Sequence, residues 1–221
     1  MSMERSARLG VTILGAGRYG LPLAECAARN GQQVVLWAER PAVAKALTEK
    51  RALPAVLPEL EVLHEAVEVT ARLDRAVRAS HTLVVAVRAA DVRPLARKLG
   101  EFADPSQVIV HVVRGLEPGT LERPSRVLRR ETALRKVGAM LGPALVDEML
   151  AGRPNAFVVA SRYPEVAERM TAAFAHDTLR VYTSSDLAGV EIAAAAASVG
   201  AVAVGIALEL ALGPATLGML L

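Results

Sequence analysis

A glycine-rich loop near the start of the chain constrains the fold more than any other feature. It follows residues 9–14 (LGVTIL), which have the composition of a short buried strand. Gly15, Gly17 and Gly20 come next, in the sequence GAGRYG. The segment after them, LPLAECAARNG, has helical spacing of its apolar residues and closes on a glycine. This order predicts a strand, a tight loop and a helix.

A second apolar run with an acidic residue at its end gives the glycines a more specific meaning. Residues 33–37 (QVVLW) predict another strand, and Glu39 follows nineteen positions after Gly20. Gly15 permits a tight turn, Gly17 lets phosphates approach the backbone, and Gly20 lets helix and strand pack closely. These features predict a Rossmann-type unit whose helix N-terminus binds the pyrophosphate of a nicotinamide dinucleotide.

Two neighbouring residues decide which dinucleotide is expected. The carboxylate of Glu39 can accept hydrogen bonds from ribose hydroxyls and would repel a 2′-phosphate, which favours NAD over NADP. Arg40 weakens this preference, because a guanidinium can bind a phosphate. The alternative is a loop that serves only as scaffold and binds no cofactor.

Strand-like runs alternate with helix-forming segments over most of the chain, which predicts an α/β fold with a doubly wound parallel sheet. A segment with two prolines, residues 51–61, predicts a loop. Further strands are expected at 67–70, 81–87, 107–113, 137–141, 156–160 and 179–182, and helices at 41–50, 91–99, 121–137 and 164–175.

The pattern changes near residue 185, where strand signals stop. Residues 192–208 carry no charge and are rich in alanine. We therefore expect a Rossmann domain over 1–185 and an apolar helix over 186–221. The uncharged run is short and poor in leucine and isoleucine, which favours a buried helix over a membrane span. Such a helix needs cover, so residues 187–221 are expected to pack on the sheet domain, a second copy or a protein partner.

Composition argues against several classes of function. The net charge is +3 and acidic residues are interleaved with basic ones, so nucleic-acid binding is not indicated. Four histidines lack metal-ligand spacing, and we predict no metal site. Cys26 is the single cysteine and cannot form an intrachain disulfide, so a structural thiol and a cytoplasmic location are expected.

A basic cluster lies in the predicted helix 121–137. Because Glu122 and Glu131 share this segment, the sequence favours a solvated helix over an anion-binding face. His111, within VIVHVV, indicates a sheet position rather than a catalytic one. The basic residues are Arg123, Arg126, Arg129, Arg130, Arg135 and Lys136.

Several ordered motifs resemble those of the NAD(P)-dependent glycerol-3-phosphate dehydrogenases. The family motifs are GAGxWGxAxA, LWxR, YLP…LP, KGL, SGPxxAxE and FRVYxxxDxxGVE. The resembling segments here are GAGRYGLPLA at 15–24, LWAER at 36–40, ALPAVLP at 52–58, RGL at 114–116, LGPALVDE at 141–148 and LRVYTSSDLAGVE at 179–191.

The resemblance implies hydride transfer between NAD(P)H and dihydroxyacetone phosphate. It places the substrate near Arg114, Gly142 and Ala144. The implied cofactor-binding residues are Gly15, Gly17, Arg18, Tyr19, Gly20, Glu39, Arg40, Arg114 and Val146.

The chain departs from the family at its catalytic positions. The family's Lys-Asn pair, whose lysine moves the proton of the substrate hydroxyl, is replaced by Ala197 and Ser198. A methyl group cannot move a proton. Arg114 replaces the lysine of KGL, keeping the charge but not the capacity to act as a base. Leu141 replaces the serine of SGP. No catalytic residue is therefore assigned.

These departures leave three hypotheses. The family continues for roughly a hundred residues into a helical substrate domain, whereas this sequence stops at Leu221, so the substrate half of the site is expected to be missing. The leading hypothesis is a short, diverged member that binds a nicotinamide cofactor with activity lost or weak. The second is a non-catalytic Rossmann scaffold that interacts through its terminal helix. The third is an active oxidoreductase on another small substrate, completed by a partner.

Overall fold

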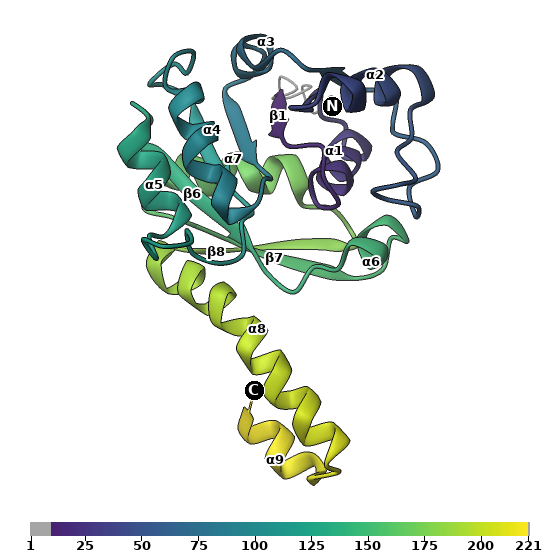
Figure 1. The fold of residues 1–221 in the computed structure, drawn as a ribbon, viewed down its shortest axis with the longest axis vertical. Coiled ribbons are helices and arrows are strands. Elements are labelled where there is room, and N and C mark those ends of the chain that lie inside the picture. Colours follow the sequence, from purple (N-terminus) through teal and green to yellow (C-terminus); the bar gives the residue numbers. More distant parts are fainter. Residues whose placement is uncertain (1–9, 221) are drawn as a thin grey trace, which may run out of the picture.

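One eight-stranded sheet forms the centre of the protein, seen here in a computed structural model that describes residues 10–220 (Figure 1). The strand order is β3-β2-β1-β4-β5-β6-β7-β8. Residues 1–9 and Leu221, which the expected domains include, lie outside the described residues. The strands are β1 (Val11–Leu14), β2 (Val34–Trp37), β3 (Val67–Thr70), β4 (Thr82–Val85), β5 (Val108–His111), β6 (Lys136–Leu141), β7 (Asn155–Ser161) and β8 (Leu179–Ser184).

The predicted doubly wound parallel sheet is confirmed for its first six strands. Neighbours among β1 to β6 all pair in parallel. β7 pairs antiparallel to β6, and β8 runs parallel to β7, so this edge of the sheet is reversed. The apolar runs of these strands carry no sign of direction, which is why the sequence did not reveal the reversal.

Helices cover both faces of the sheet, because alternate strand residues point to opposite sides. On one face, Ile13, Leu36 and Phe157 are buried with α1 and α7. On the other, Leu83 and Ile109 are buried with α3, α4 and α5. The helices are α1 (Gly20–Arg29), α2 (Pro41–Lys50), α3 (Leu73–Arg78), η1 (Ala89–Asp91), α4 (Val92–Leu99), α5 (Pro124–Glu131), α6 (Val146–Leu150), α7 (Pro164–Phe174), α8 (Leu187–Glu209) and α9 (Gly213–Leu220).

The helix predicted over 121–137 is wrong at both ends. Leu121 has a positive φ of 56°, and Pro124 occupies the first turn of α5, where its missing N–H costs nothing. Thr132 is extended and ends the helix. The basic residues beyond it therefore lie on a separate segment that leads into β6.

The terminal helices leave the sheet domain and project away from it (Figure 1). Only Glu191 and Ala207 of α8 are buried within the described chain, so the sheet domain does not cover this helix. Cover by a second copy or by a protein partner stays a prediction. The expected single helix is also broken, since Ala211 and Gly213 have positive φ angles of 51° and 78°. By length and apolar composition, α8 is the one helix among residues 10–220 that could cross a membrane.

Candidate functional site

The glycine loop joins β1 to α1 with little free space around two of its three glycines. Gly15 has φ +126°, and a Cβ there would overlap the carbonyl oxygen of Ala86. A Cβ on Gly20, the first residue of α1, would overlap the carbonyl oxygen of Gly15. Gly17 differs, because a Cβ there would have no described atom within 4 Å. Packing therefore requires Gly15 and Gly20, while Gly17 faces open space.

This open space is a cleft of about 660 Å³ at the carboxyl ends of β1, β2 and β4. β1 lies between β2 and β4, so the chain order reverses here, which is where open α/β sheets bind ligands. The N-terminus of α1 adds the partial positive charge of a helix start. Six of the predicted cofactor-binding residues line the cleft, namely Gly15, Gly17, Arg18, Tyr19, Glu39 and Arg40.

A second cleft of about 490 Å³ adjoins the first and shares four of its lining residues. Arg114, Ala144 and Val146, which the family resemblance assigns to the cofactor or the substrate, line this second cleft. The shared residues are Arg18, Tyr19, Val87 and Arg88. The two clefts together, here called the groove, bring together predicted residues from β1 to α6.

Ion pairs hold several charged side chains around the groove. Lys98 Nζ lies 3.3 Å from Glu39 Oε1, and Glu39 is 67% exposed. Arg18 pairs with Glu59 at 2.9 Å. Arg88, which the sequence reasoning missed, pairs with Asp91 at 2.7 Å. The sequence could have indicated that Arg88 lines the groove, because this residue comes just after β4, the strand beside β1.

Tyr19 and Arg114 lie next to each other in the lining of the second cleft. The Tyr19 hydroxyl donates a hydrogen bond to the Ala144 carbonyl at 3.5 Å. Burial raises the pKa of Tyr19, and the charge of Arg114 offsets part of this rise. The Arg114 guanidinium donates to the Gly142 carbonyl, so Gly142 positions Arg114.

The departures from the family motifs occupy two different places. Ala197 and Ser198 are exposed on α8 and line neither part of the groove. Leu141 is buried at the end of β6, where an apolar side chain is well placed. Arg114 keeps a positive charge at the position of the KGL lysine and lines the second cleft together with Arg18 and Arg88.

A buried polar cluster joins α8 to the sheet domain, and the sequence reasoning assigned it no role. Glu191 accepts hydrogen bonds from His111 Nε2 at 3.0 Å, the Ser125 N–H at 2.9 Å, the Ser125 hydroxyl at 2.6 Å and Arg123 at 2.8 Å. Burial alone would raise the pKa of Glu191, but the hydrogen bond from His111 and the other donors outweigh it and lower the pKa. The sequence could have indicated this cluster, because Glu191 is an isolated acidic residue on an apolar helix and a buried charge needs polar partners.

The other reactive groups are set apart from the groove. Cys26 is a free, buried thiol, and burial raises its pKa to about 11, which keeps it protonated and unreactive. Among residues 10–220, no group of three or more His, Cys, Asp and Glu side chains is arranged to hold a metal ion.

The fold and the groove define a Rossmann-type α/β domain. A family model described as the N-terminus of NAD-dependent glycerol-3-phosphate dehydrogenase matches residues 10–167. A glycerol-3-phosphate dehydrogenase [NAD(P)+] of Moorella thermoacetica is 37% identical over 206 residues, covering 93% of this chain and 61% of the relative. One from Thioalkalivibrio sulfidiphilus is 35% identical over 197 residues, covering 89% and 59%. The chain belongs to the NAD-dependent glycerol-3-phosphate dehydrogenase family.

Solved structures agree on the fold. Glycerol-3-phosphate dehydrogenase from Coxiella burnetii superposes with a TM-score of 0.84 at 24% identity, covering 96% of this chain and 65% of that one. The Plasmodium falciparum enzyme gives 0.85 at 12% identity, covering 96% and 62%. The chain spans about three fifths of the length of the curated relatives it matches.

Proposed function

We propose that this protein binds a nicotinamide dinucleotide along the groove, with NAD preferred over NADP. The observation that carries the proposal is the open space at Gly17, between two glycines that packing requires. The pyrophosphate would lie against Gly17 and the start of α1, and the adenosine ribose beside Glu39. The nicotinamide ring would lie toward Arg114 and Val146. When bound, the cofactor supplies a hydride donor or acceptor.

We further propose that hydride transfer to dihydroxyacetone phosphate is lost or weak. Ala197 stands at the family's proton-transferring lysine, and its methyl group has no acid–base chemistry. Arg114 is held at the Gly142 carbonyl and stays protonated, so it can polarise a carbonyl but not act as a base. The similarity to glycerol-3-phosphate dehydrogenases supports the substrate class.

The test pairs binding with activity. Titration calorimetry with NAD and NADP is expected to show binding, and Gly17→Val should weaken it by at least about tenfold by blocking the phosphates, since roughly 1.4 kcal/mol is a factor of ten. Its melting temperature should stay unchanged, because the added Cβ meets no described atom within 4 Å. Absence of binding by the wild type overturns the proposal.

Gly20→Ala and a turnover assay complete this experiment. Gly20→Ala should lower the melting temperature, because its Cβ would overlap Gly15. NADH absorbance with dihydroxyacetone phosphate should stay constant. Turnover clearly above background would contradict the loss of activity while leaving cofactor binding intact.

A second candidate function is a non-catalytic scaffold that acts through α8. Val199, Val202 and Ile206 recur at helical spacing on α8 and are 73%, 63% and 56% exposed. An apolar stripe of this kind favours association with a second copy or with another protein. Cofactor binding separates this candidate from the first, since a scaffold needs none.

A further inference from the structure

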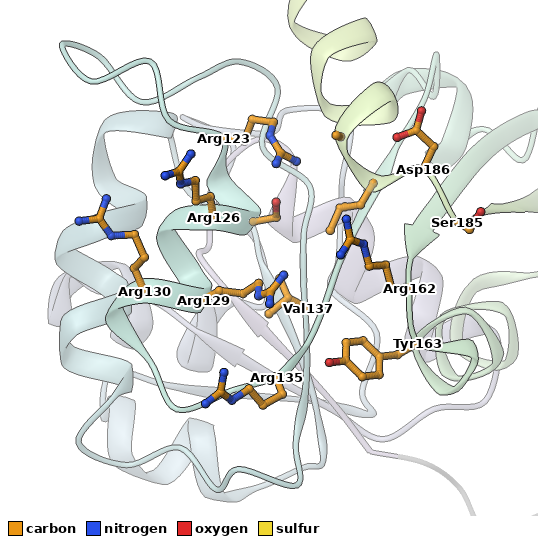
Figure 2. A pocket seen from close by; sticks show the side chains of 13 residues that line it. Arg123, Arg126, Arg129, Arg130, Arg135, Val137, Arg162, Tyr163, Ser185 and Asp186 are labelled. Carbon is orange, nitrogen blue, oxygen red and sulfur yellow. The ribbon is translucent and has the colours of Figure 1, made fainter.

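Arginines from three separate segments meet in a pocket on the side of α5 that faces the start of α8 (Figure 2). α5 contributes Arg126, Arg129 and Arg130. Arg135 comes from the segment before β6, and Arg162 from the segment after β7. The pocket has a volume of about 470 Å³ and shares no lining residue with the groove.

Three of these guanidinium groups have no ionic partner among residues 10–220. Arg126 and Arg130 both pair with Glu122, at 3.3 and 2.7 Å. No ion pair or side-chain hydrogen bond of the described residues engages the guanidinium groups of Arg129, Arg135 and Arg162. Charge within the pocket is therefore poorly compensated.

The acidic groups nearby are already engaged elsewhere. Glu122 forms ion pairs with Arg126, Arg130 and Arg93. Glu191 is buried and pairs with Arg123, which lines the pocket. The one acid in the lining, Asp186, accepts a hydrogen bond from the Gly189 N–H and caps α8.

The directions of the side chains support a shared ligand. Arg129 and Arg162 extend toward each other from opposite sides of the pocket (Figure 2). Like charges held face to face repel, and an anion between them removes this repulsion. A guanidinium presents paired N–H donors that match the oxygens of a phosphate. The start of α8, at Leu187 and Ala188, adds its helix dipole to the same space.

We infer that this pocket binds a small molecule carrying at least two phosphate groups, at a site separate from the groove. The sequence favoured a solvated helix because Glu122 and Glu131 lie among the arginines of one segment. That reasoning covers Arg126 and Arg130 but not Arg129, which shares the pocket with Arg135 and Arg162 from other segments. The concave shape favours a small polyanion over a nucleic acid, which needs an extended basic surface.

The experiment titrates the protein with inorganic tripolyphosphate at low ionic strength and measures binding by titration calorimetry. The wild type should bind one equivalent saturably. Arg129→Ala/Arg162→Ala should weaken binding by about tenfold or more, since each lost charged hydrogen bond has an effect of that order. Both side chains are exposed and unpaired, so the melting temperature should not change.

The control variant is Arg78→Ala/Arg180→Ala, which removes the same charge from two exposed arginines outside the pocket. It should bind as the wild type does, and so should Gly17→Val, because the groove is a different site. Equal weakening by the control pair would show non-specific charge attraction and overturn the inference. No saturable binding, or binding of an oligonucleotide in preference to tripolyphosphate, would overturn it as well.

Discussion

Glu191 Oε1 lies 3.0 Å from His111 Nε2, with both side chains buried between α8 and the sheet. His111 Nδ1 accepts a hydrogen bond from the Val113 N–H at 3.3 Å, so the ring proton is on Nε2 and points at Glu191. His111 therefore donates a hydrogen bond to the Glu191 carboxylate. Arg123 supplies the compensating positive charge at 2.8 Å. This cluster ties the first turns of α8 to β5 and α5.

Removing the carboxylate should destabilise the protein. Glu191→Ala leaves the donors of His111 and Ser125 buried without an acceptor, and breaking a buried charged pair costs about 3 kcal/mol. Urea denaturation should show the lower free energy of unfolding. Glu209→Gln, on the exposed end of the same helix, should have almost no effect. An equal effect of both variants would mean that Glu191 is not a structural anchor.

The same carboxylate should make stability depend on pH. The folded state holds the pKa of Glu191 below its ordinary value of 4.5. A lowered pKa stabilises the folded state fully above the unfolded value and loses this effect as pH falls through the folded value. The difference in unfolding free energy between wild type and Glu191→Gln should thus be constant near neutrality and shrink below about pH 4.5. A difference that does not change with acid would contradict this assignment.

The sequence predicted the parts of the site that are local in the chain. Gly15, Gly17 and Gly20 occupy one turn whose geometry depends on their spacing, and Glu39 follows the adjoining strand. Interactions between distant segments were not predictable in this way. Glu191 lies 80 residues from His111, and only the fold brings the two together.

The arginine pocket shows the same limit. Arg129 and Arg162 face one pocket because β7 reverses direction after β6, and periodicity does not reveal that reversal. The exposure of α8 could not be predicted either. Its apolar composition indicated that the surface of α8 must pack against another surface, but not which surface that is.

Glu39 should control the choice between the two dinucleotides. Its carboxylate repels a 2′-phosphate, and at 4 Å in water two unit charges interact by about 1 kcal/mol. Glu39→Gln removes this repulsion and releases Lys98, now 3.3 Å away, to attract the phosphate. NADPH affinity should rise by about fivefold while NADH affinity falls slightly. Fluorescence titration with both cofactors measures the two constants.

The control is Glu49→Gln, the same change on an exposed position of α2 outside the groove. It should leave both affinities unchanged. If Glu39→Gln also leaves the ratio of the two affinities unchanged, Glu39 does not determine cofactor preference.

The exposed face of α8 should drive association of the protein in solution. Val202 is 63% exposed between Val199 and Ile206, so this stripe can bury its apolar surface only against another molecule or a rearranged chain. Light scattering at micromolar concentration should give a mass above the 23.3 kDa of one chain.

Val202→Glu should lower the measured mass to that of one chain. It should not lower the melting temperature, because the side chain of Val202 has few contacts to lose. Ser106→Glu adds the same charge to an exposed loop of the sheet domain and should leave the assembly intact. A wild type that stays monomeric in buffer, or binds lipid vesicles instead, would rule out self-association through α8.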